Sequence, residues 1–264
     1  MGLTEKLETY ARVWAEVDLD AICRNMDHMK ANLADKTQMI AVIKADGYGH
    51  GSVPVARALE GLPYLYGFAT ATYEEAAILR KAGVEKPILI LGYVFPYCHR
   101  ELIRQEIRAA LFRWDSAVEL SKAAVSLGKE ALVHIKVDTG MSRIGIRPDD
   151  SGLEFMKRVA ALPGIRVEGI FTHFAKADET DKTPALAQFE RFSRFTDKVH
   201  QETGLHIPFC HCSNSAGIIR LPQANMDLVR AGIATYGLYP SEEVCRSNVP
   251  LKPALELISH VVHV

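Results

Sequence analysis

The feature that most constrains the fold is a regular alternation of short apolar runs with amphipathic stretches. Eight runs have the length and composition of buried strands, and they lie at residues 39–45, 65–70, 87–92, 107–112, 132–138, 165–171, 207–212 and 226–231. Stretches with helical spacing lie between them, at residues 52–60, 72–82, 97–106, 115–128, 149–161, 184–204 and 214–220. Strands that are apolar throughout are typical of a parallel sheet covered on both faces.

Eight strand and helix units predict an α/β fold in which the sheet closes into a (β/α)8 TIM-type barrel. An open doubly wound sheet is the alternative, and it is disfavoured because no GxGxxG motif follows the first strand of the series. The longest predicted helix carries an apolar stripe that we expect to pack against the barrel, formed by Leu186, Phe189, Phe192, Phe195 and Val199.

Both ends of the chain carry β-type patterns outside the eight units. The run Val13–Leu19 alternates as a strand does, and Asp20 is expected to cap the helix that follows. A fresh apolar run, Ala254–Val264, begins after a polar loop. We therefore predict an N-terminal segment and strand (1–19), a barrel (20–240), and a linker with the first strand of a truncated C-terminal β-domain (241–264). The strand in 1–19 is expected to pair with that domain.

Composition excludes several classes of protein. A net charge of -1 with 24% charged residues offers no field for nucleic acid or membrane surfaces. The polar segment Met1–Tyr10 lacks the apolar core of a signal peptide, and no run has the length of a membrane span. Five scattered cysteines indicate a reduced, cytoplasmic protein. Strand alternation separates His211 from Cys210 and Cys212, so we predict no metal site there.

A lysine follows the first run of the series. Lys44 comes directly after Met39–Ile43 and precedes a turn with three glycines, Gly47–Gly51. A lysine at the mouth of a buried strand loses solvent, which favours the neutral, nucleophilic amine. An ordinary lysine that extends into water is the alternative. The glycines and Tyr48 favour a functional site.

Further polar groups follow other strands of the predicted barrel. In such barrels the C-terminal ends of the strands form the active-site face, so we expect convergence of Lys44, Lys136–Gly145, His173, His211–Gly217 and Arg230–Ile233. Asn214 and Ser215 open a helix and offer donors to an anion, and Gly232 offers further backbone donors. A nucleophilic lysine beside a phosphate site suggests pyridoxal 5'-phosphate.

Each of these groups also has an ordinary structural explanation. Asn214 and Ser215 suit a helix cap, and His173 suits a core position. Arg143 and Arg230 could form ion pairs with Asp138 and Asp227. Their joint placement at successive strand ends is what favours a site.

The segments that carry these residues resemble bacterial alanine racemases. Ala41–Gly51 is similar to the lysine motif that attaches pyridoxal phosphate in that family, and Lys136–Gly145, His173–Phe174, His211–Ser215 and Arg230–Ile233 match its later motifs in order. The match runs from Trp14 to Val264. Asp46-Gly47 and Ser142 depart from the commonest family form, and neither removes a catalytic group.

The resemblance implies roles for individual residues. Lys44, His173 and Arg230 would be catalytic, Arg143 would also contact the substrate, and Lys136 would be a candidate carbamylated lysine. The implied cofactor contacts are Lys44, Tyr48, Arg143, His173, His211, Asn214, Ser215, Arg230, Gly232, Ile233 and Tyr236. Because an arginine does not give up its proton, Arg230 would keep the pyridine nitrogen unprotonated.

The resemblance also implies the reaction and the assembly. The complete protein would be a cytoplasmic head-to-tail homodimer that interconverts L- and D-alanine and supplies D-alanine to peptidoglycan. Racemisation needs a base on each face of Cα, and the second base would be a tyrosine from the partner's C-terminal β-domain. No segment before Val264 matches the motif that holds it. We therefore expect these 264 residues alone to bind the cofactor weakly and to racemise poorly.

Three alternatives stay open. The chain could belong to a racemase for serine or another small amino acid, including the soluble part of a membrane-tethered resistance protein. It could be a non-catalytic carrier of pyridoxal phosphate, although the tail at 253–264 disfavours this. A barrel that binds a sugar phosphate, with Lys44 as an aldolase-type base, would leave Arg230 without a ring partner.

Overall fold

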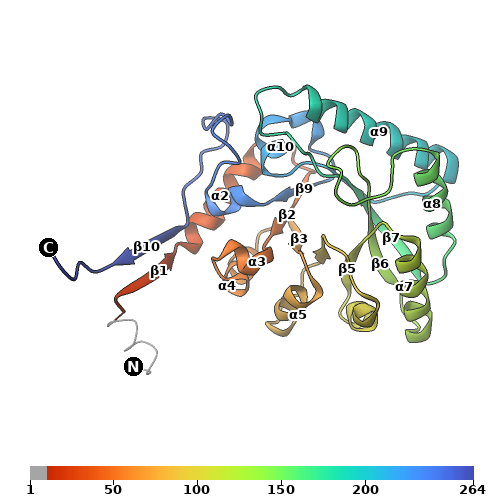
Figure 1. The fold of residues 1–264 in the computed structure, drawn as a ribbon, viewed down its shortest axis with the longest axis horizontal. Coiled ribbons are helices and arrows are strands. Elements are labelled where there is room, and N and C mark those ends of the chain that lie inside the picture. The colour runs from red at the N-terminus through yellow and green to blue at the C-terminus, as the bar shows by residue number, and fades with distance from the viewer. Residues whose placement is uncertain (1–10) are drawn as a thin grey trace.

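The computed structural model describes residues 11–264. Eight parallel strands form one sheet in the order β8-β7-β6-β5-β4-β3-β2-β9 (Figure 1). The strands are β2 (Gln38–Val42), β3 (Leu65–Thr70), β4 (Ile88–Ile90), β5 (Ile107–Leu111), β6 (Ala131–Lys136), β7 (Ile165–Phe171), β8 (Phe209–His211) and β9 (Leu228–Ala231). All eight predicted strands are present, so the predicted parallel sheet is confirmed.

The sheet closes between its two end strands, β8 and β9. The amide of Asp227 donates to the carbonyl of Cys210 at 3.2 Å, and the amide of Arg230 donates to the carbonyl of Ser213 at 3.0 Å. These two bonds join β8 to β9 in place of the regular hydrogen-bond pattern that joins the other neighbouring strands. The predicted (β/α)8 barrel is therefore confirmed, and the open doubly wound sheet is wrong.

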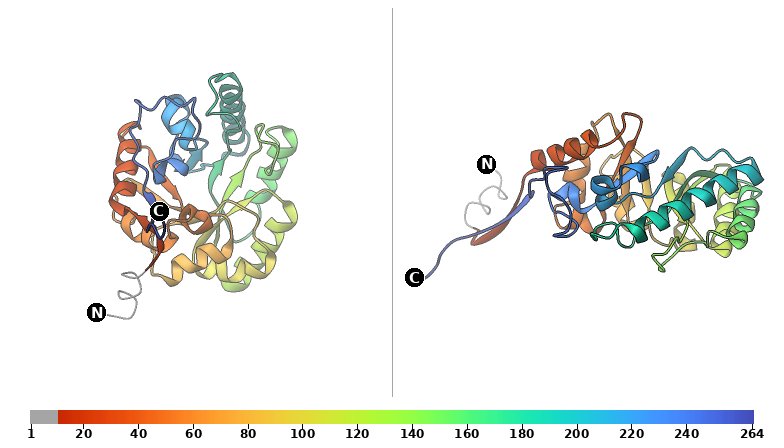
Figure 2. Two further views of the ribbon diagram at one scale, coloured as in Figure 1. Left: turned by 60° about the vertical axis from the view of Figure 1, so that its left-hand side comes forward. Right: turned by 90° about the horizontal axis from the view of Figure 1, so that it is seen from above.

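Helices surround the barrel (Figures 1 and 2). They are α2 (Leu19–Ala31), α4 (Ser52–Leu59), α5 (Tyr73–Lys81), α6 (His99–Arg104), α7 (Trp114–Leu127), α8 (Asp150–Ala160), α9 (Thr183–Thr203) and α10 (Ser215–Arg220), with short 3-10 turns at Pro96–Cys98, Pro222–Ala224 and Ile233–Tyr236. The predicted cap at Asp20 is wrong. Asp18 caps α2 instead, because its carboxylate accepts the amide of Ala21 at 2.8 Å and Asp20 already lies in the first turn.

Two apolar layers stabilise the barrel. The larger lies between strands and helices, and it includes the fully buried Phe192 of α9. A smaller cluster inside the barrel joins Ile40, Ala69, Leu89 and Leu228. The predicted stripe on α9 packs inward as expected, except that Leu186 is 37% exposed.

A two-stranded antiparallel arm extends from one end of the barrel (Figure 2). It pairs β1 (Val13–Val17) with β10 (Leu255–Ser259). Both predicted terminal strands exist and contact each other, while the division into three domains stays a prediction. Residues 1–10 lie outside the described residues. The prediction that this polar segment is not a signal peptide falls on them. Within residues 11–264, no helix is both long and apolar enough to cross a bilayer.

Candidate active site

A cavity of about 550 Å3 opens at the C-terminal ends of the strands. Most of the residues predicted for the site lie in its wall: Lys44, Tyr48, Lys136, Arg143, His173, Asn214, Ser215, Arg230, Gly232 and Ile233. Apolar groups complete it, among them Val42, Leu91, Phe171 and Tyr93. Four of the lining residues are lysine or arginine and none is acidic in the described part of the chain. The cavity therefore favours an anionic ligand.

Lys44 begins a left-handed turn rather than ending a strand. β2 stops at Val42, three residues before the predicted end, and the turn Lys44–Tyr48 (α3) follows. Ala45, Asp46, Gly47 and Tyr48 have φ values of 51°, 50°, 61° and 53°. Each such residue other than glycine costs roughly 1–2 kcal/mol. Lys44 is half-buried, so its expected loss of solvent is only partial.

Side chains from two elements hold this unfavourable turn. One oxygen of Glu75, on α5, accepts the amide of Ala45 at 2.8 Å, and the other accepts the amide of Ala71 at 2.7 Å. Asp46 accepts the amide and the hydroxyl of Ser52 at 2.8 and 3.0 Å. Sequence reasoning missed Glu75, because nothing local links it to a turn 30 residues earlier.

Ser215, Gly232 and Tyr48 meet at one end of the cavity. The Ser215 hydroxyl oxygen accepts the amides of Gly232 and Ala234 at 3.0 and 3.2 Å, so its own proton remains available to a ligand. A Cβ at Gly232 would lie 3.6 Å from Tyr48 Oη and 3.7 Å from Ser215 Oγ. Burial raises the pKa of Tyr48, which keeps its hydroxyl a donor. The expected backbone donor at Gly232 is already bonded to Ser215.

Arg230 is held from several sides. Nη2 donates to the carbonyls of Thr172 and Cys212 at 2.7 and 2.9 Å, and Nη1 contacts His211 Nδ1 at 2.8 Å. Within residues 11–264 no bond uses Nε, and Arg230 lines the cavity. The ion pair suggested between Arg230 and Asp227 is absent from the described chain, because the Asp227 carboxylate accepts the amide of Cys210. The Nε–H of Arg230 is thus among the donors that remain for a ligand.

The positive charges around the cavity lower the pKa values of His173 and Lys136. Burial, with the charges of Arg230 and Arg143, lowers the pKa of His173 to about 3, so its imidazole is neutral. Burial, with the charge of Arg230, lowers the pKa of Lys136 to about 8. The ammonium of Lys136 reaches the carbonyls of Val137 and Ile144 at 2.7 and 3.2 Å. The suggested pair of Arg143 with Asp138 is also absent from the described residues, since Asp138 accepts the amides of Gly140 and Ser142.

Two residues expected among the cofactor contacts lie behind the cavity wall. His211 is fully buried beneath Arg230 and stacks on Phe171. Tyr236 donates to the carbonyl of Val42 at 3.0 Å and packs against Tyr48. They therefore contact residues of the cavity wall and do not themselves line the cavity, and their predicted contact with a cofactor stays a prediction. Asn214 does cap α10, because it accepts the amide of Gly217 at 3.0 Å, and it also lines the cavity.

The chain is similar to known proteins along most of its length. A family model described as the N-terminal domain of alanine racemase matches residues 17–240. The curated alanine racemase of Desulforamulus reducens is 45% identical over 254 residues, which cover 96% of this chain and 68% of that protein. The alanine racemase of Clostridium perfringens strain SM101 is also 45% identical, and the match covers 64% of its length.

Solved structures agree with these relatives. The alanine racemase of Clostridium difficile 630 in complex with cycloserine has a TM-score of 0.91 and 38% identity, over 94% of this chain and 68% of that one. The Bacillus anthracis alanine racemase with bound L-Ala-P has a TM-score of 0.86 and 37% identity, over 94% of this chain and 64% of that one. The chain thus spans about two thirds of the length of its relatives.

Proposed function

The chain belongs to the alanine racemase family, and on that premise we propose that its cavity binds pyridoxal 5'-phosphate and that the complete protein interconverts L- and D-alanine. One observation carries the proposal: Lys44, Arg230 and the hydroxyls of Tyr48 and Ser215 converge on a single cavity. An amine, a fixed donor and an anion site are the groups that this cofactor requires.

The residues present fit the cofactor at both of its polar ends. The Cβ of any other residue at position 232 would occupy the space between the hydroxyls of Tyr48 and Ser215, so glycine leaves room for a phosphate there. Asn214 and Ile233 border the same region. Arg230 has Nε available for the ring nitrogen, and Arg143 lies in the wall for the ring oxygen and for the substrate carboxylate.

The chemistry follows from these positions. When bound, pyridoxal phosphate accepts negative charge from the Cα of an attached amino acid. Lys44 then removes or returns the Cα proton on one face. Arg230 would hold the ring nitrogen of the cofactor as a hydrogen-bond donor and would not give up its proton to it. Neutral His173, beside Arg230 at 3.4 Å, completes that side of the wall.

Inversion needs a second base on the opposite face of Cα. Tyr48 borders the phosphate region, and His173 has its pKa lowered to about 3, which makes it a poor base near neutral pH. By resemblance to the alanine racemase family, we assign the second base to a tyrosine from the partner subunit of a head-to-tail homodimer. A polypeptide of these 264 residues is expected to racemise far more slowly than its full-length relatives.

Lys136 is a candidate for carbamylation. A pKa of about 8 leaves a substantial fraction of neutral amine near neutral pH, and the neutral amine attacks carbon dioxide. The nitrogen gains a carboxylate and releases one proton to water. The new negative charge would lie near Arg230 and Arg143, whose positive charges already lower the pKa of Lys136.

The proposal is tested by adding pyridoxal phosphate to the protein and following visible absorption. The wild type should develop the band of a lysine-bound cofactor, and Lys44→Ala should not. Lys122→Ala, on the exposed face of α7, is the matched control. An absorption band that Lys44→Ala leaves unchanged would disprove the assignment.

Substrate and biological role need separate measurements. A panel of L-alanine, L-serine and other small amino acids on the full-length protein tests the preference for alanine over the serine alternative. Cofactor binding without any racemisation by the full-length protein would favour the carrier. A cytoplasmic supply of D-alanine for peptidoglycan is the role that the activity would serve.

A further inference from the structure

A chain of buried polar side chains leads from Arg230 into the interior of the barrel. Arg230 Nη1 lies 2.8 Å from His211 Nδ1, and His211 Nε2 lies 2.9 Å from His134 Nδ1. His134 Nε2 lies 3.6 Å from Glu168 Oε2. The four residues come from β9, β8, β6 and β7, so the chain connects the cavity-lining Arg230 to three side chains that do not line the cavity.

The proton positions in this chain must agree with both of its charged ends, Arg230 as a donor and Glu168 as an acceptor. A guanidinium only donates, so His211 Nδ1 must be the acceptor. A neutral His211 then carries its proton on Nε2 and donates to His134 Nδ1. A neutral His134 in turn carries its proton on Nε2, facing Glu168. Burial lowers the pKa of both histidines, which keeps them neutral.

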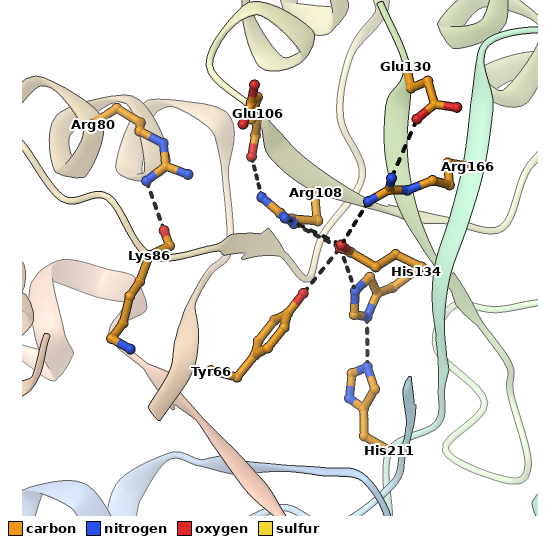
Figure 3. Close-up of polar contacts among 10 residues, drawn as sticks. Tyr66, Arg80, Lys86, Glu106, Arg108, Glu130, His134, Arg166 and His211 are labelled. Carbon is orange, nitrogen blue, oxygen red and sulfur yellow. Dashed lines mark hydrogen bonds and ion pairs between the residues drawn. The ribbon is translucent and has the colours of Figure 1, made fainter. Parts of the chain in front are cut away.

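Glu168 is a suitable end for such a chain because it stays ionised. Its carboxylate accepts Arg108 Nε at 2.8 Å and the hydroxyl of Tyr66 at 3.1 Å, and Arg166 lies 3.6 Å away. Burial alone would raise its pKa, but the nearby His134 ring and the bonds and charge of Arg108 lower it to about 2. Figure 3 shows His134 between His211 and the group formed by Tyr66, Arg108 and Arg166.

The backbone is shaped to seat the His134 ring. Gly169, on the neighbouring strand β7, would place a Cβ only 2.4 Å from His134 Nδ1. His211 is fixed as well, since its ring stacks on Phe171 with centroids 4.9 Å apart and planes 4° apart. His134 Nε2 is fully buried and has no hydrogen-bond partner in the described chain, and the carboxylate that it faces at 3.6 Å is that of Glu168.

We propose that His134 and Glu168 are positioning residues that set the proton direction of His211 and so hold Arg230 as a fixed donor toward the cavity. Without the Glu168 charge, His134 is free to carry its proton on Nδ1, where it opposes the proton on His211 Nε2. His211 would then carry its single proton on Nδ1, facing Arg230, and could no longer accept the hydrogen bond from Arg230 Nη1. This inference rests on the proposed function only for its effect on catalysis.

The first test needs no cofactor. In protein labelled with 15N-histidine, two-bond proton–nitrogen spectra near neutral pH distinguish the two neutral tautomers and the charged ring. We expect both His134 and His211 to be neutral with the proton on Nε2, with assignments from His134→Asn and His211→Asn. A proton on Nδ1 of either ring, or a charged ring, in the wild type would overturn the proposal.

The second test uses Glu168→Gln, with Glu101→Gln on the surface of α6 as its control. The His134 signal should change from one tautomer to a mixture, while the control keeps the wild-type pattern. If Glu168→Gln does not fold, Gly169→Ala displaces the same ring and should shift the same signals. Wild-type spectra from either folded variant would refute the role of the carboxylate.

The third test measures the effect on function in the full-length protein. Glu168→Gln should lower kcat about tenfold, the lower end of the loss found when partners that orient metal ligands are removed, and leave KM for alanine within about twofold. A change in KM with kcat unaltered would oppose the proposal. If no cofactor binds at all, the proposed function fails, and the tautomer measurements still decide the proton direction.

Discussion

Lys136 makes the free energy of unfolding depend on pH, and the substitution Lys136→Met removes this dependence. Its side chain is buried at the end of β6, and burial with the charge of Arg230 lowers its pKa from 10.5 to about 8. Lys136→Met keeps the length and apolar body of the side chain and removes the ammonium. The free energy of unfolding of the two proteins should therefore differ by an amount that changes with pH.

The magnitude follows from the shift. The pKa of Lys136 falls from 10.5 to about 8 on folding. At about 1.4 kcal/mol for each tenfold change, burying the charged ammonium therefore costs roughly 3 kcal/mol of folding free energy. Between the folded pKa near 8 and the unfolded pKa near 10.5, the unfolded chain binds more protons, so the stability contributed by Lys136 rises with pH. Below the folded pKa the full cost applies, and above the unfolded pKa it is gone.

The assay is urea unfolding of both proteins in buffers free of carbon dioxide, since a carbamate would remove the ammonium. The variant's advantage over the wild type should shrink by about 2–3 kcal/mol between about pH 7 and about pH 10. Lys136→Met also loses the hydrogen bonds to the carbonyls of Val137 and Ile144. This loss changes the difference in unfolding free energy by a constant amount and does not change how that difference varies with pH. Lys122→Met, on a side chain that is 68% exposed, should give a flat difference. A flat difference for Lys136→Met would refute the reasoning.

Three further predictions concern the turn, the core and a strained loop. Glu75→Ala removes the acceptor that holds the Lys44 turn, so the dissociation constant of pyridoxal phosphate should rise about tenfold or more in absorption titrations, and exposed Glu74→Ala should not change it. Phe192→Ala should cost about 3–5 kcal/mol in urea unfolding, against under about 1 kcal/mol for Leu186→Ala, and equal costs would contradict the burial pattern of α9. Ser142 has a φ of 57°, so Ser142→Gly should raise stability by about 0.5–1 kcal/mol, and a loss of stability would show that serine is not strained there.

Much of the barrel follows from local sequence pattern. Apolar runs such as 65–70 and 165–171 coincide with β3 and β7 residue for residue. Each run is recognised by its own apolar composition and length, so its prediction needs no tertiary information. Polar residues placed after such runs converge because parallel strands end at the same side of a barrel.

The turn at Lys44 could not be predicted in the same way. The run was expected to continue as a strand to residue 45, yet the chain enters a left-handed turn at Ala45. Such a turn is unfavourable by itself and exists because Glu75, from another helix, accepts one of its amides. The interaction that stabilises the left-handed turn Lys44–Tyr48 therefore comes from a residue outside the turn.

The sequence by itself determined the barrel, the lysine at its mouth and the set of groups around the cavity, because hydrophobic periodicity and strand-end placement are local properties. Only the tertiary structure decided which residues lie behind that wall. His134 stands inside an apolar run and Glu168 inside another, and neither pattern reveals that the two side chains meet. Their contact with Arg230 through His211 depends on the closure of the barrel, which brings β6, β7, β8 and β9 around one interior.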